Sequence, residues 1–528
     1  MLKIRQLKVP VLDDNEKFLK KVIAKKLHVN VNMINNYKIQ KKSIDARDKN
    51  NVLFIYEVIV SISSEEKVLE KYKSNDILKY QDETYEIPKK GINKLDNRIV
   101  IVGSGPAGLF TALILSEAGY KPLIIERGEG MEERIITVNN FWQTGKLDLN
   151  SNVQFGEGGA GTFSDAKLST LVNDKFCRGK KVLETFVKYG APQDILYLQY
   201  PHVGTDIIRK VIINMRNDIK KKGGEFYYNS CLTDLIIENN TLKAIEINNK
   251  QKIACDNLVL AIGHSARDTF SLLLKKKLDI KSKPFAIGIR IEHLQEMINY
   301  SQYGKYAKYL PPASYKLTYT TSLERGVYSF CMCPGGFVVN ASSEKNRLVI
   351  NGMSNYKRDS LNANSALIVT VSPKDYGTHP FDGINFQRRI EEKAYKAGNG
   401  KIPLQLYRDY LNNKVSSNFG SFKTEVKGDY CFANLNDILP DYINNSLKEA
   451  MKNFGQKIKG FDSDDAILTG VEMRSSSPIR IMRDDDFEAN IKGIYPCGEG
   501  AGYAGGIMTS AIDGIKVAEA LIKKYSSE

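Results

Sequence analysis

Apolar and polar positions along residues 1–90 follow the pattern of a small unit of mixed helix and strand. A run over Leu2–Val9 predicts a strand, and the segment that begins near Asp13 predicts a helix. The apolar side chains of that helix recur on one face: Phe18, Leu19, Val22, Ile23 and Leu27. Two further runs, Tyr37–Ile44 and Val52–Ile62, predict strands. The strand–helix–strand–strand order favours a separate α+β module, such as a ferredoxin-like half.

A second pattern begins after a polar stretch, residues 88–97, which is typical of a linker. The apolar run Arg98–Val102 predicts a buried strand that breaks into Gly103-Ser-Gly-Pro-Ala-Gly108 and an amphipathic helix. The next apolar run, Pro122–Ile125, ends on the carboxylate of Glu126. Strand, glycine turn, helix, strand and acidic residue together make the fingerprint of a dinucleotide-binding domain.

Each part of this fingerprint has a physical role. Gly103 makes the tight turn, Gly105 lets the backbone approach a pyrophosphate, and Gly108 lets the helix pack closely on the strand. The free N–H groups and the positive end of the helix dipole face the phosphates. Glu126 follows at the distance where a carboxylate accepts hydrogen bonds from an adenosine ribose. We therefore expect the chain to bind a dinucleotide at this point.

The glycine pattern alone is weak, because it occurs three times. The match that begins at Gly156 follows a short polar segment, and no long amphipathic helix succeeds it. The match that begins at Gly500 opens a helix, but no acidic strand follows. Only the match at Gly103 has the full unit, so a second complete dinucleotide site is not expected.

The rest of the chain predicts a nucleotide domain that is interrupted by an insertion. A helix over 206–222 and three strands lead into the buried run Asp256–Gly263. The stretch that follows is mixed α/β, with strands such as Gly326–Cys333 and a helix over Phe386–Ala397, and it holds no cofactor fingerprint. We expect a doubly wound, Rossmann-like domain with an inserted substrate domain and the N-terminal module. The expected segments are residues 1–90, 96–275, 276–485 (the insertion) and 486–528.

Several segments together resemble FAD-binding flavoproteins of the glutathione-reductase type. They are most similar to a bacterial family of uncharacterised FAD-dependent dehydrogenases, grouped with NAD(P)/FAD-dependent oxidoreductases. The segments that carry the resemblance are 156–168, 261–268, 283–288, 328–336, 351–354, 472–478 and 498–506. Two positions depart from the family pattern: Ala166, where glycine is expected, and Met473, where threonine is expected.

The resemblance implies that FAD is the cofactor, with its ADP half at the fingerprint and its flavin half near the C-terminus. Glu499 would bond a ribityl hydroxyl, and the helix after it would direct its N-terminus at the pyrimidine edge of the flavin. The loop from Gly156 to Leu168 would lie over the pyrophosphate or the flavin edge. The expected cofactor-binding residues are Gly103, Gly105, Pro106, Ala107, Gly108, Glu126, Arg127, Gly158, Gly159, Thr162, Lys167, Gly263, Gly498, Glu499, Gly505, Gly506 and Ile507.

Candidates for chemistry at the substrate are fewer. Arg474 is the first choice for a charged group there, with Arg290 and Tyr503 as weaker candidates. Two cysteines two residues apart, Cys331 and Cys333, are interpreted as buried strand thiols, because a disulfide across that spacing is strained. No metal site is expected, since no second cysteine pair or histidine cluster completes one. His264 is interpreted as a structural histidine.

Composition narrows the class of protein. With 528 residues the chain is too long for one hydrophobic core. Seven scattered cysteines favour reduced thiols, and neither a signal peptide nor a membrane-spanning run is recognised, so a cytoplasmic protein is expected. The net charge of +15 is spread along the chain and mixed with acids, so a nucleic-acid partner is not favoured.

These observations predict an FAD-dependent oxidoreductase that transfers hydride between a small organic substrate and flavin. NAD(P)H is a possible transient electron donor, bound in the substrate cleft. Two alternatives stay open. One is a flavin-dependent RNA-modifying enzyme, suggested by the positive charge and the N-terminal module. The other is a non-catalytic, flavin-bound scaffold in which residues 1–90 recruit a protein partner.

Overall fold

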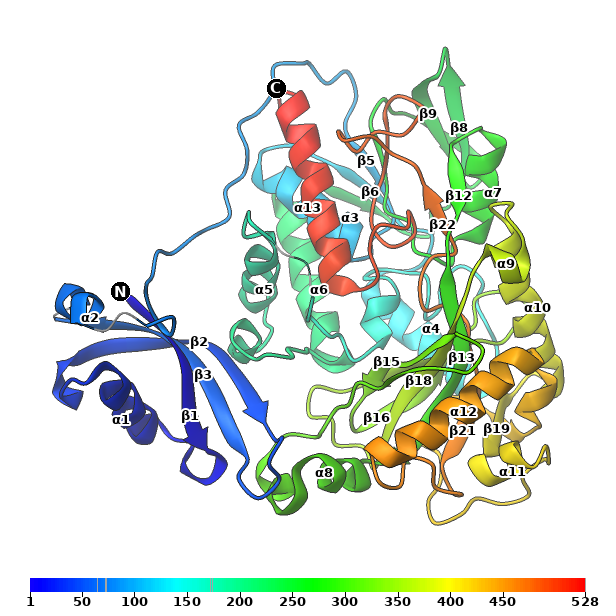
Figure 1. Ribbon diagram of the computed structural model, residues 1–528. Helices are drawn as coiled ribbons and strands as arrows, with labels where there is room; N and C mark the ends of the chain where they lie inside the picture. The colour runs from blue at the N-terminus through cyan, green and yellow to red at the C-terminus, as the bar shows by residue number, and fades with distance from the viewer. Residues whose placement is uncertain (64, 72–73, 171, 173, 528) are drawn as a thin grey trace.

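The N-terminal module is a four-stranded antiparallel sheet covered by two helices in the computed structural model, which describes residues 1–63, 65–71, 74–170, 172 and 174–527 (Figure 1). The strands lie in the order β2-β3-β1-β4, so two strand–helix–strand units interleave. Their elements are β1 (Leu2–Pro10), α1 (Glu16–Leu27), β2 (Ile34–Asp45), β3 (Leu53–Ile62), α2 (Glu65–Lys71) and β4 (Ile77–Lys79).

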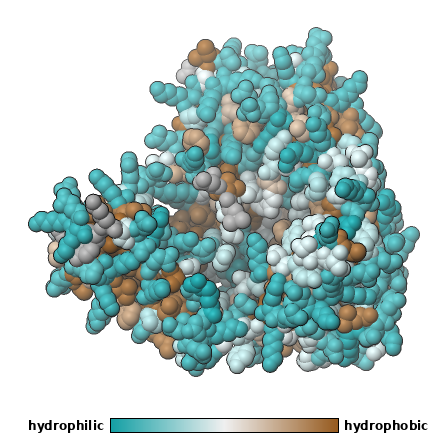
Figure 2. All heavy atoms as spheres, viewed as in Figure 1, coloured by the Kyte–Doolittle hydropathy of each residue, from teal (hydrophilic) through white to brown (hydrophobic). Residues whose placement is uncertain are grey.

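The module has a hydrophobic core of its own. Leu19, Ile23 and Leu27 of α1 are buried against alternating residues of β1 and β3, while Phe18 and Val22 pack at the rim. In the space-filling view the module stands as a separate lobe on the left, and hydrophilic residues prevail on the face shown (Figure 2). An independent core of this kind follows from the period-two and helical patterns of the sequence.

The second region of the chain is built on a five-stranded parallel sheet, in the order β23-β11-β5-β6-β7. Helices α3, α13 and α6 cover one of its faces, and a three-stranded antiparallel sheet, β10-β9-β8, adjoins it (Figure 1). The elements of this region are β5 (Val100–Val102), α3 (Pro106–Glu117), β6 (Leu123–Ile125), α4 (Met131–Thr144), α5 (Arg178–Lys188), α6 (Thr205–Lys221), β7 (Glu225–Tyr227), β8 (Leu232–Glu238), β9 (Thr241–Ile247), β10 (Gln251–Ala254), β11 (Leu258–Leu260), α7 (Arg267–Lys275), β23 (Ile494–Pro496) and α13 (Ile507–Lys524).

The insertion is built on a seven-stranded mixed sheet, in the order β14-β15-β18-β13-β21-β19-β20, with a β16-β17 hairpin beside it. The pair β12-β22 joins the two ends of the insertion. The elements are β12 (Ile280–Ser282), β13 (Phe285–Leu294), α8 (Gln295–Tyr303), β14 (Thr318–Thr320), β15 (Gly326–Cys333), β16 (Gly336–Asn340), β17 (Ile350–Ser354), β18 (Asn362–Val371), α9 (Pro373–Tyr376), α10 (Asp382–Ala397), β19 (Ile402–Leu406), α11 (Tyr407–Leu411), β20 (Tyr430–Phe432), α12 (Asp441–Lys457), β21 (Ile467–Glu472) and β22 (Ile479–Ile481).

The helix of the fingerprint differs from its prediction. The sequence suggested an amphipathic helix, but residues 107–116 of α3 are all buried. The reason is that α13, some four hundred residues later in the chain, packs against the side of α3 that the parallel sheet leaves open. Helix α3 is therefore apolar on every side, as a helix between two layers must be.

None of the helices in the described part of the chain is both long and apolar enough to cross a lipid bilayer.

Candidate functional site

A cavity of about 420 Å³ lies where the carboxyl ends of the parallel strands meet the sheet of the insertion. This edge is where doubly wound folds bind their ligands. One end of the cavity is lined by the fingerprint turn and the residues after β6, and the other by side chains of the insertion. The lining includes Gly103, Gly105, Pro106, Ala107, Glu126, Arg127, Gln154, Gly159, Ser164, Lys167, Gly263, His264, Phe330, Cys331, Asn351, Glu472, Arg474, Glu499, Gly505, Gly506 and Ile507.

Two glycines of the fingerprint are required by close backbone approaches. Gly103 has a φ of 100°, and a Cβ atom on it would lie 2.4 Å from the carbonyl oxygen of Ala261. A Cβ on Gly108 would lie 1.9 Å from the carbonyl oxygen of Gly103. The middle glycine, Gly105, has only the Cα of Gly159 nearby, at 3.8 Å, so its open side faces the cavity. The turn therefore has the close packing and the open backbone that a pyrophosphate needs.

Glu126 lies at the end of β6 with its carboxylate buried at the cavity wall. Ser104 donates to it twice, from its N–H at 3.0 Å and its Oγ at 2.7 Å. The N–H groups of Gly128 and Gly156 each donate to its other oxygen at 3.0 Å. The carboxylate thus ties the fingerprint turn to the second glycine loop. Its neighbour Arg127 pairs with Asp268 at 2.8 Å.

The glycine loop that begins at Gly156 is held from behind by Arg134 of α4. This guanidinium is completely buried and donates to the carbonyl oxygens of Gly156 (3.2 Å), Glu157 (2.6 Å) and Gly159 (2.9 Å). Burial lowers the pKa of Arg134 to about 9. Because Arg134 satisfies the carbonyls, the loop can present its other side to the cavity.

The C-terminal loop combines packed and open glycines. A Cβ on Gly500 would lie 1.6 Å from the carbonyl oxygen of Ile262, so this residue packs closely against the segment that follows β11. In contrast, nothing lies within 4 Å of a Cβ on Gly505 or Gly506. Helix α13 begins directly after them at Ile507, so its first N–H groups are directed at the cavity.

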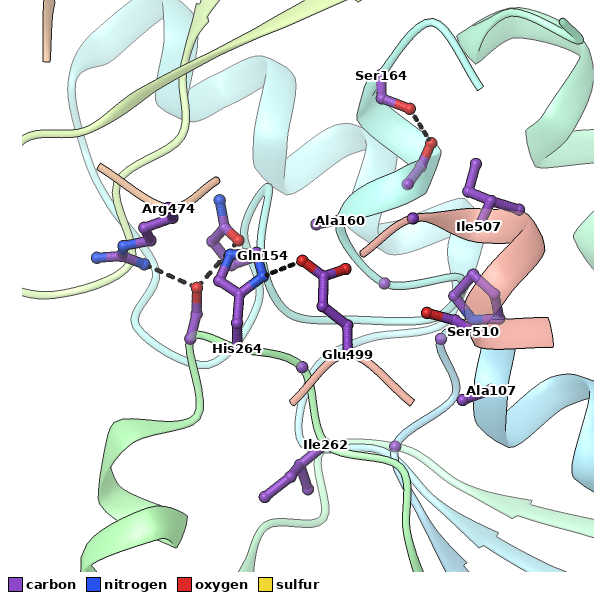
Figure 3. Close-up of a pocket in the computed structure, with 18 of the residues that line it drawn as sticks. Ala107, Gln154, Ala160, Ser164, Ile262, His264, Arg474, Glu499, Ile507 and Ser510 are labelled. Atoms are coloured by element: carbon purple, nitrogen blue, oxygen red, sulfur yellow. Dashed lines mark hydrogen bonds and ion pairs between the residues drawn. The ribbon is translucent and has the colours of Figure 1, made fainter. Parts of the chain in front are cut away.

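Two separate groups of hydrogen-bonded side chains line the cavity (Figure 3). The carboxylate of Glu499 lies 3.0 Å from Nδ1 of His264, whose Nε2 is buried and lacks a hydrogen-bond partner among the described residues. Ser265 donates to Gln154 at 3.0 Å and accepts from Arg474 at 3.0 Å. A buried ring nitrogen without a partner is a place where a bound molecule can complete a hydrogen bond.

Glu472 supplies a carboxyl group at the end of the cavity that the insertion forms. It is almost fully buried, and Arg290 Nη1 donates to its Oε2 at 2.9 Å. Burial raises the pKa of Glu472 to about 7, although Arg290 acts in the opposite direction. A group with such a pKa can both take and give a proton at neutral pH.

Arg474 also lines the cavity, but its charge is used within the protein. It makes two hydrogen bonds with Glu391, each of 3.0 Å, and donates to Ser343 at 2.6 Å. Arg267 donates to the same glutamate at 2.8 and 2.9 Å. Burial opposes ionisation of Glu391, but the two guanidiniums outweigh it and hold the pKa well below its usual range.

The structure brings most of the expected cofactor residues to the cavity. Four of them lie just outside its lining: Gly108, Gly158, Thr162 and Gly498. Gly108 and Gly498 occupy close contacts with Gly103 and Ala107, while Thr162 is buried and accepts a hydrogen bond on its carbonyl from Thr205.

Two of the three substrate-face candidates do not reach the cavity. Arg290 is completely buried behind Glu472. Tyr503 packs instead against the guanidinium of Arg483, 3.7 Å from its ring centre. Of the candidates Arg474, Arg290 and Tyr503, the structure therefore places only Arg474 in the lining.

Sequence reasoning assigned no role to several residues of the site. These are Arg134, Gln154, Ser265, Phe330, Asn351 and Glu472. A signal was present for four of them, because they lie in segments that carry the family resemblance: Ser265, Phe330, Asn351 and Glu472. Nothing in the local pattern around Arg134 separates it from an ordinary helix surface residue.

The chemistry of the cavity fits FAD. The open backbone at Gly105, Gly505 and Gly506 leaves room that only a bound molecule would fill. Helices α3 and α13 both direct their N-termini at it, which suits phosphates and an anionic ring edge. The carboxylates of Glu126 and Glu499 lie at opposite parts of the lining, where sugar and ribityl hydroxyls need acceptors.

Comparison with known proteins agrees with this geometry. Residues 96–134 match the model of an FAD binding domain, and residues 284–475 match the C-terminal domain-like model of FAD-dependent proteins. Residues 1–61 match a domain of unknown function. Glycine oxidase from Bacillus cereus is structurally similar, with 12% identity, 80% and 94% coverage of the two chains and a TM-score of 0.35.

Two curated proteins show similarity in sequence. The L-amino-acid oxidase of Naja atra is 32% identical over 96 residues, which is 17% of this chain and 19% of that protein. An uncharacterised protein of Clostridium beijerinckii is 48% identical over 521 residues, which is 97% of each chain. With this relative and both FAD-related models matched, the chain belongs to a family of FAD-dependent proteins.

Proposed function

We propose that this FAD-dependent protein is an oxidoreductase that transfers hydride between FAD and a small organic substrate, which binds at the insertion end of the cavity. The observation that carries the proposal is one cavity that runs from the fingerprint turn to the side chains of Phe330, Asn351 and Glu472. Binding of cofactor and substrate side by side in one cavity is what direct hydride transfer requires.

In this proposal the seventeen residues expected from the sequence hold FAD, directly or by packing. Gly103, Gly105 and the start of α3 hold the pyrophosphate, and Glu126 accepts from the ribose. Glu499 and the start of α13 hold the ribityl and flavin half. The bound flavin supplies a two-electron acceptor or donor.

The residues of the chain then position the substrate and move its proton. Glu472 accepts a proton from a substrate hydroxyl or amine, because its pKa lies near neutrality. Asn351 offers an amide for orientation, and Phe330 supplies apolar surface that excludes water. A second complete fingerprint is lacking in the sequence, so NAD(P)H would donate electrons only from a transient position in this same end of the cavity.

In this proposal the segments expected from the sequence have separate roles. Residues 96–275 and 486–528 hold the cofactor, and residues 276–485 provide the substrate side. The interleaved strand order supports a ferredoxin-like assignment of residues 1–90, which we propose as a site for a protein partner. Similarity to the L-amino-acid oxidase covers only 96 residues, so it does not indicate the substrate.

Purified protein tests the proposal directly. It should be yellow, with a flavin spectrum that bleaches on anaerobic reduction and returns on oxidation. Glu126→Leu should lose the colour, because it removes the acceptor at the ribose and the four hydrogen bonds that hold the turn. Colourless protein that takes up no added FAD would contradict the proposal. Titration with NADH and NADPH, followed by a metabolite screen for reoxidation, then tests the electron donor and the substrate.

A further inference from the structure

Two cysteines meet at the insertion end of the cavity, on an irregular part of β15. The register of β15 against β18 shifts between Phe330 and Cys333. Between them Cys331 has a φ of 45°, a left-handed conformation that is unfavourable for a residue with a side chain. Bulges and such backbone conformations concentrate beside active sites. Because of this irregularity, Cys331 lines the cavity and Cys333 is fully buried behind it.

The surroundings of the two thiols are positively charged. Arg290 Nη2 donates to the carbonyl oxygen of Cys331 at 2.6 Å and lies 3.9 Å from Sγ of Cys333. Lys167 lines the same cavity from the glycine-rich loop. Sγ of Cys333 donates to the carbonyl oxygen of Cys331 at 3.3 Å, so the two residues are in direct contact. Reactive cysteines are found in partly exposed, electropositive places of this kind.

The pKa values of the two thiols are shifted in opposite directions. The adjacent Cys333 thiol lowers the pKa of Cys331, against the effect of burial, and Lys167 and Arg290 lower it further. The same contact, together with burial, raises the pKa of Cys333. One thiolate at the cavity with a protonated thiol beside it is the state from which a disulfide forms.

We propose that Cys331 and Cys333 form a redox-active dithiol at the substrate end of the FAD cavity. The inference rests on the proposed function, since the flavin is the electron partner. When the Sγ–Sγ bond forms from the Cys331 thiolate and the Cys333 thiol, the one S–H bond is lost, and its proton and the two electrons reduce the bound flavin to its anionic reduced form. In the reverse direction the reduced flavin returns the two electrons and the proton, and the disulfide opens to a thiolate and a thiol. Strain across the Cys-x-Cys spacing makes such a disulfide easily reduced.

Thiol trapping of the full-length holoprotein tests the proposal. The protein is equilibrated in glutathione buffers of increasing oxidised fraction, quenched in acid, denatured and alkylated. The tryptic peptide 326–345, which contains Cys331 and Cys333, should escape alkylation in oxidising buffers and weigh less by two hydrogen atoms. Cys431 on β20, outside the cavity lining, should be alkylated in every buffer. Reversible formation of this disulfide supports the proposal. Full alkylation of Cys331 and Cys333 in all buffers would overturn it.

Electron counting provides a second readout. Anaerobic titration of the oxidised holoprotein should take up about four electrons per flavin, two for the flavin and two for the disulfide. Cys331→Ser should reduce the uptake to about two electrons with the flavin spectrum retained, and Cys431→Ser should leave it at about four. Uptake of two electrons by the wild-type protein would overturn the proposal. The trapping assay is also run on protein freed of flavin, so a failure to bind FAD is distinguishable from inert thiols.

Discussion

Glu391 is buried between two guanidiniums, those of Arg267 and Arg474, and it joins the cavity lining to α10. Loss of its charge would leave two buried arginines without their shared partner. We expect Glu391→Gln to lower the free energy of unfolding by about 3–5 kcal/mol, as measured by chemical denaturation at neutral pH. The neighbouring Glu392, which is 41% exposed in its pair with Arg347, provides a matched control. Glu392→Gln should cost about 0–1 kcal/mol.

The same residue predicts a pH dependence of stability. The pKa of Glu391 is lower in the folded protein than in the unfolded chain, so its contribution is present at neutral pH. It is lost as the pH falls below the unfolded pKa, near 4.3 for a glutamate, towards the folded one. Wild-type protein should therefore lose more stability between about pH 5 and about pH 2 than Glu391→Gln does. Parallel curves for the two proteins would contradict this account.

For Glu472 we expect a pH dependence of stability in the opposite direction to that of Glu391. Burial raises its pKa to about 7, so its proton is held more tightly in the folded state and its stabilising effect is lost as the pH rises through about 7. If the carboxylate is the proton acceptor, the rate of flavin reduction by substrate should rise through the same pH. Glu472→Gln should remove this rise and slow reduction by about 10²–10⁴-fold, as measured by stopped flow. Glu449→Gln, at a half-buried glutamate of α12 outside the cavity lining, should change neither.

At the scale of elements, substitutions in the C-terminal glycine loop should affect stability and cofactor binding at different positions. A Cβ on Gly505 meets nothing within 4 Å in the protein, whereas a Cβ on Gly500 would lie 1.6 Å from a carbonyl oxygen. Gly505→Val should therefore keep the thermal stability of the apoprotein and weaken FAD binding by at least about tenfold, because the side chain projects into the cofactor space. Calorimetry with added FAD measures both quantities.

Gly500→Ala serves as the contrasting variant. It should destabilise the apoprotein itself, since the loop must move away from Ile262, just after β11, to admit a methyl group. The explanation fails if Gly505→Val binds FAD as tightly as the wild-type protein does.

Local sequence patterns predicted the elements that are long enough to show a clear hydrophobic periodicity. The helix expected over 507–524 is α13, and the strand Gly326–Cys333 is β15. Helix α2 and strand β4 were not predicted, because seven polar-rich residues and a three-residue strand provide too little periodicity. The period of β15 likewise gave no sign of the left-handed Cys331, since its backbone conformation is imposed by the register against β18.

Much of the candidate site was accessible from motifs, and the remainder depends on tertiary contacts. Gly103 and Glu126 follow from turn chemistry and spacing, and Glu499 follows from the family resemblance. The pairing of Glu472 with Arg290 joins β21 to β13, so it requires the sheet order. Ala166 shows how a departure from the family pattern becomes intelligible: its φ of 50° is one that glycine adopts without cost.

At the scale of the whole molecule, the N-terminal module touches the rest of the chain at few places. Lys42 of β2 exchanges backbone hydrogen bonds with Tyr197 (2.7 Å) and Gln199 (2.9 Å). The hydroxyl of Tyr306, which also packs against the core of the module, donates to the carbonyl of Asn50 at 3.1 Å. Such limited contact, with a core on each side, indicates that the module folds independently.

The segment of residues 85–95, which includes most of the expected linker, packs against the cofactor domain. Tyr85, Ile87 and Leu95 pack against the core that contains α3 and α13. Gly91 donates a backbone hydrogen bond to Ile522 near the end of α13, at 2.8 Å. A truncation that removes the module should therefore begin before Tyr85, so that this segment stays in place.

Two truncated proteins test this division. Residues 84–528 should retain FAD and bleach on reduction like the full chain, because every residue of the cavity lining lies within them. Residues 98–528 should bind FAD less firmly and unfold at a lower temperature, since three apolar side chains no longer cover α13. Residues 1–80 should unfold cooperatively on their own in circular dichroism. If residues 84–528 bind FAD but lose turnover that the full chain supports, the module acts on the reaction through a partner or substrate. Loss of FAD from residues 84–528 would instead make the module part of the cofactor domain.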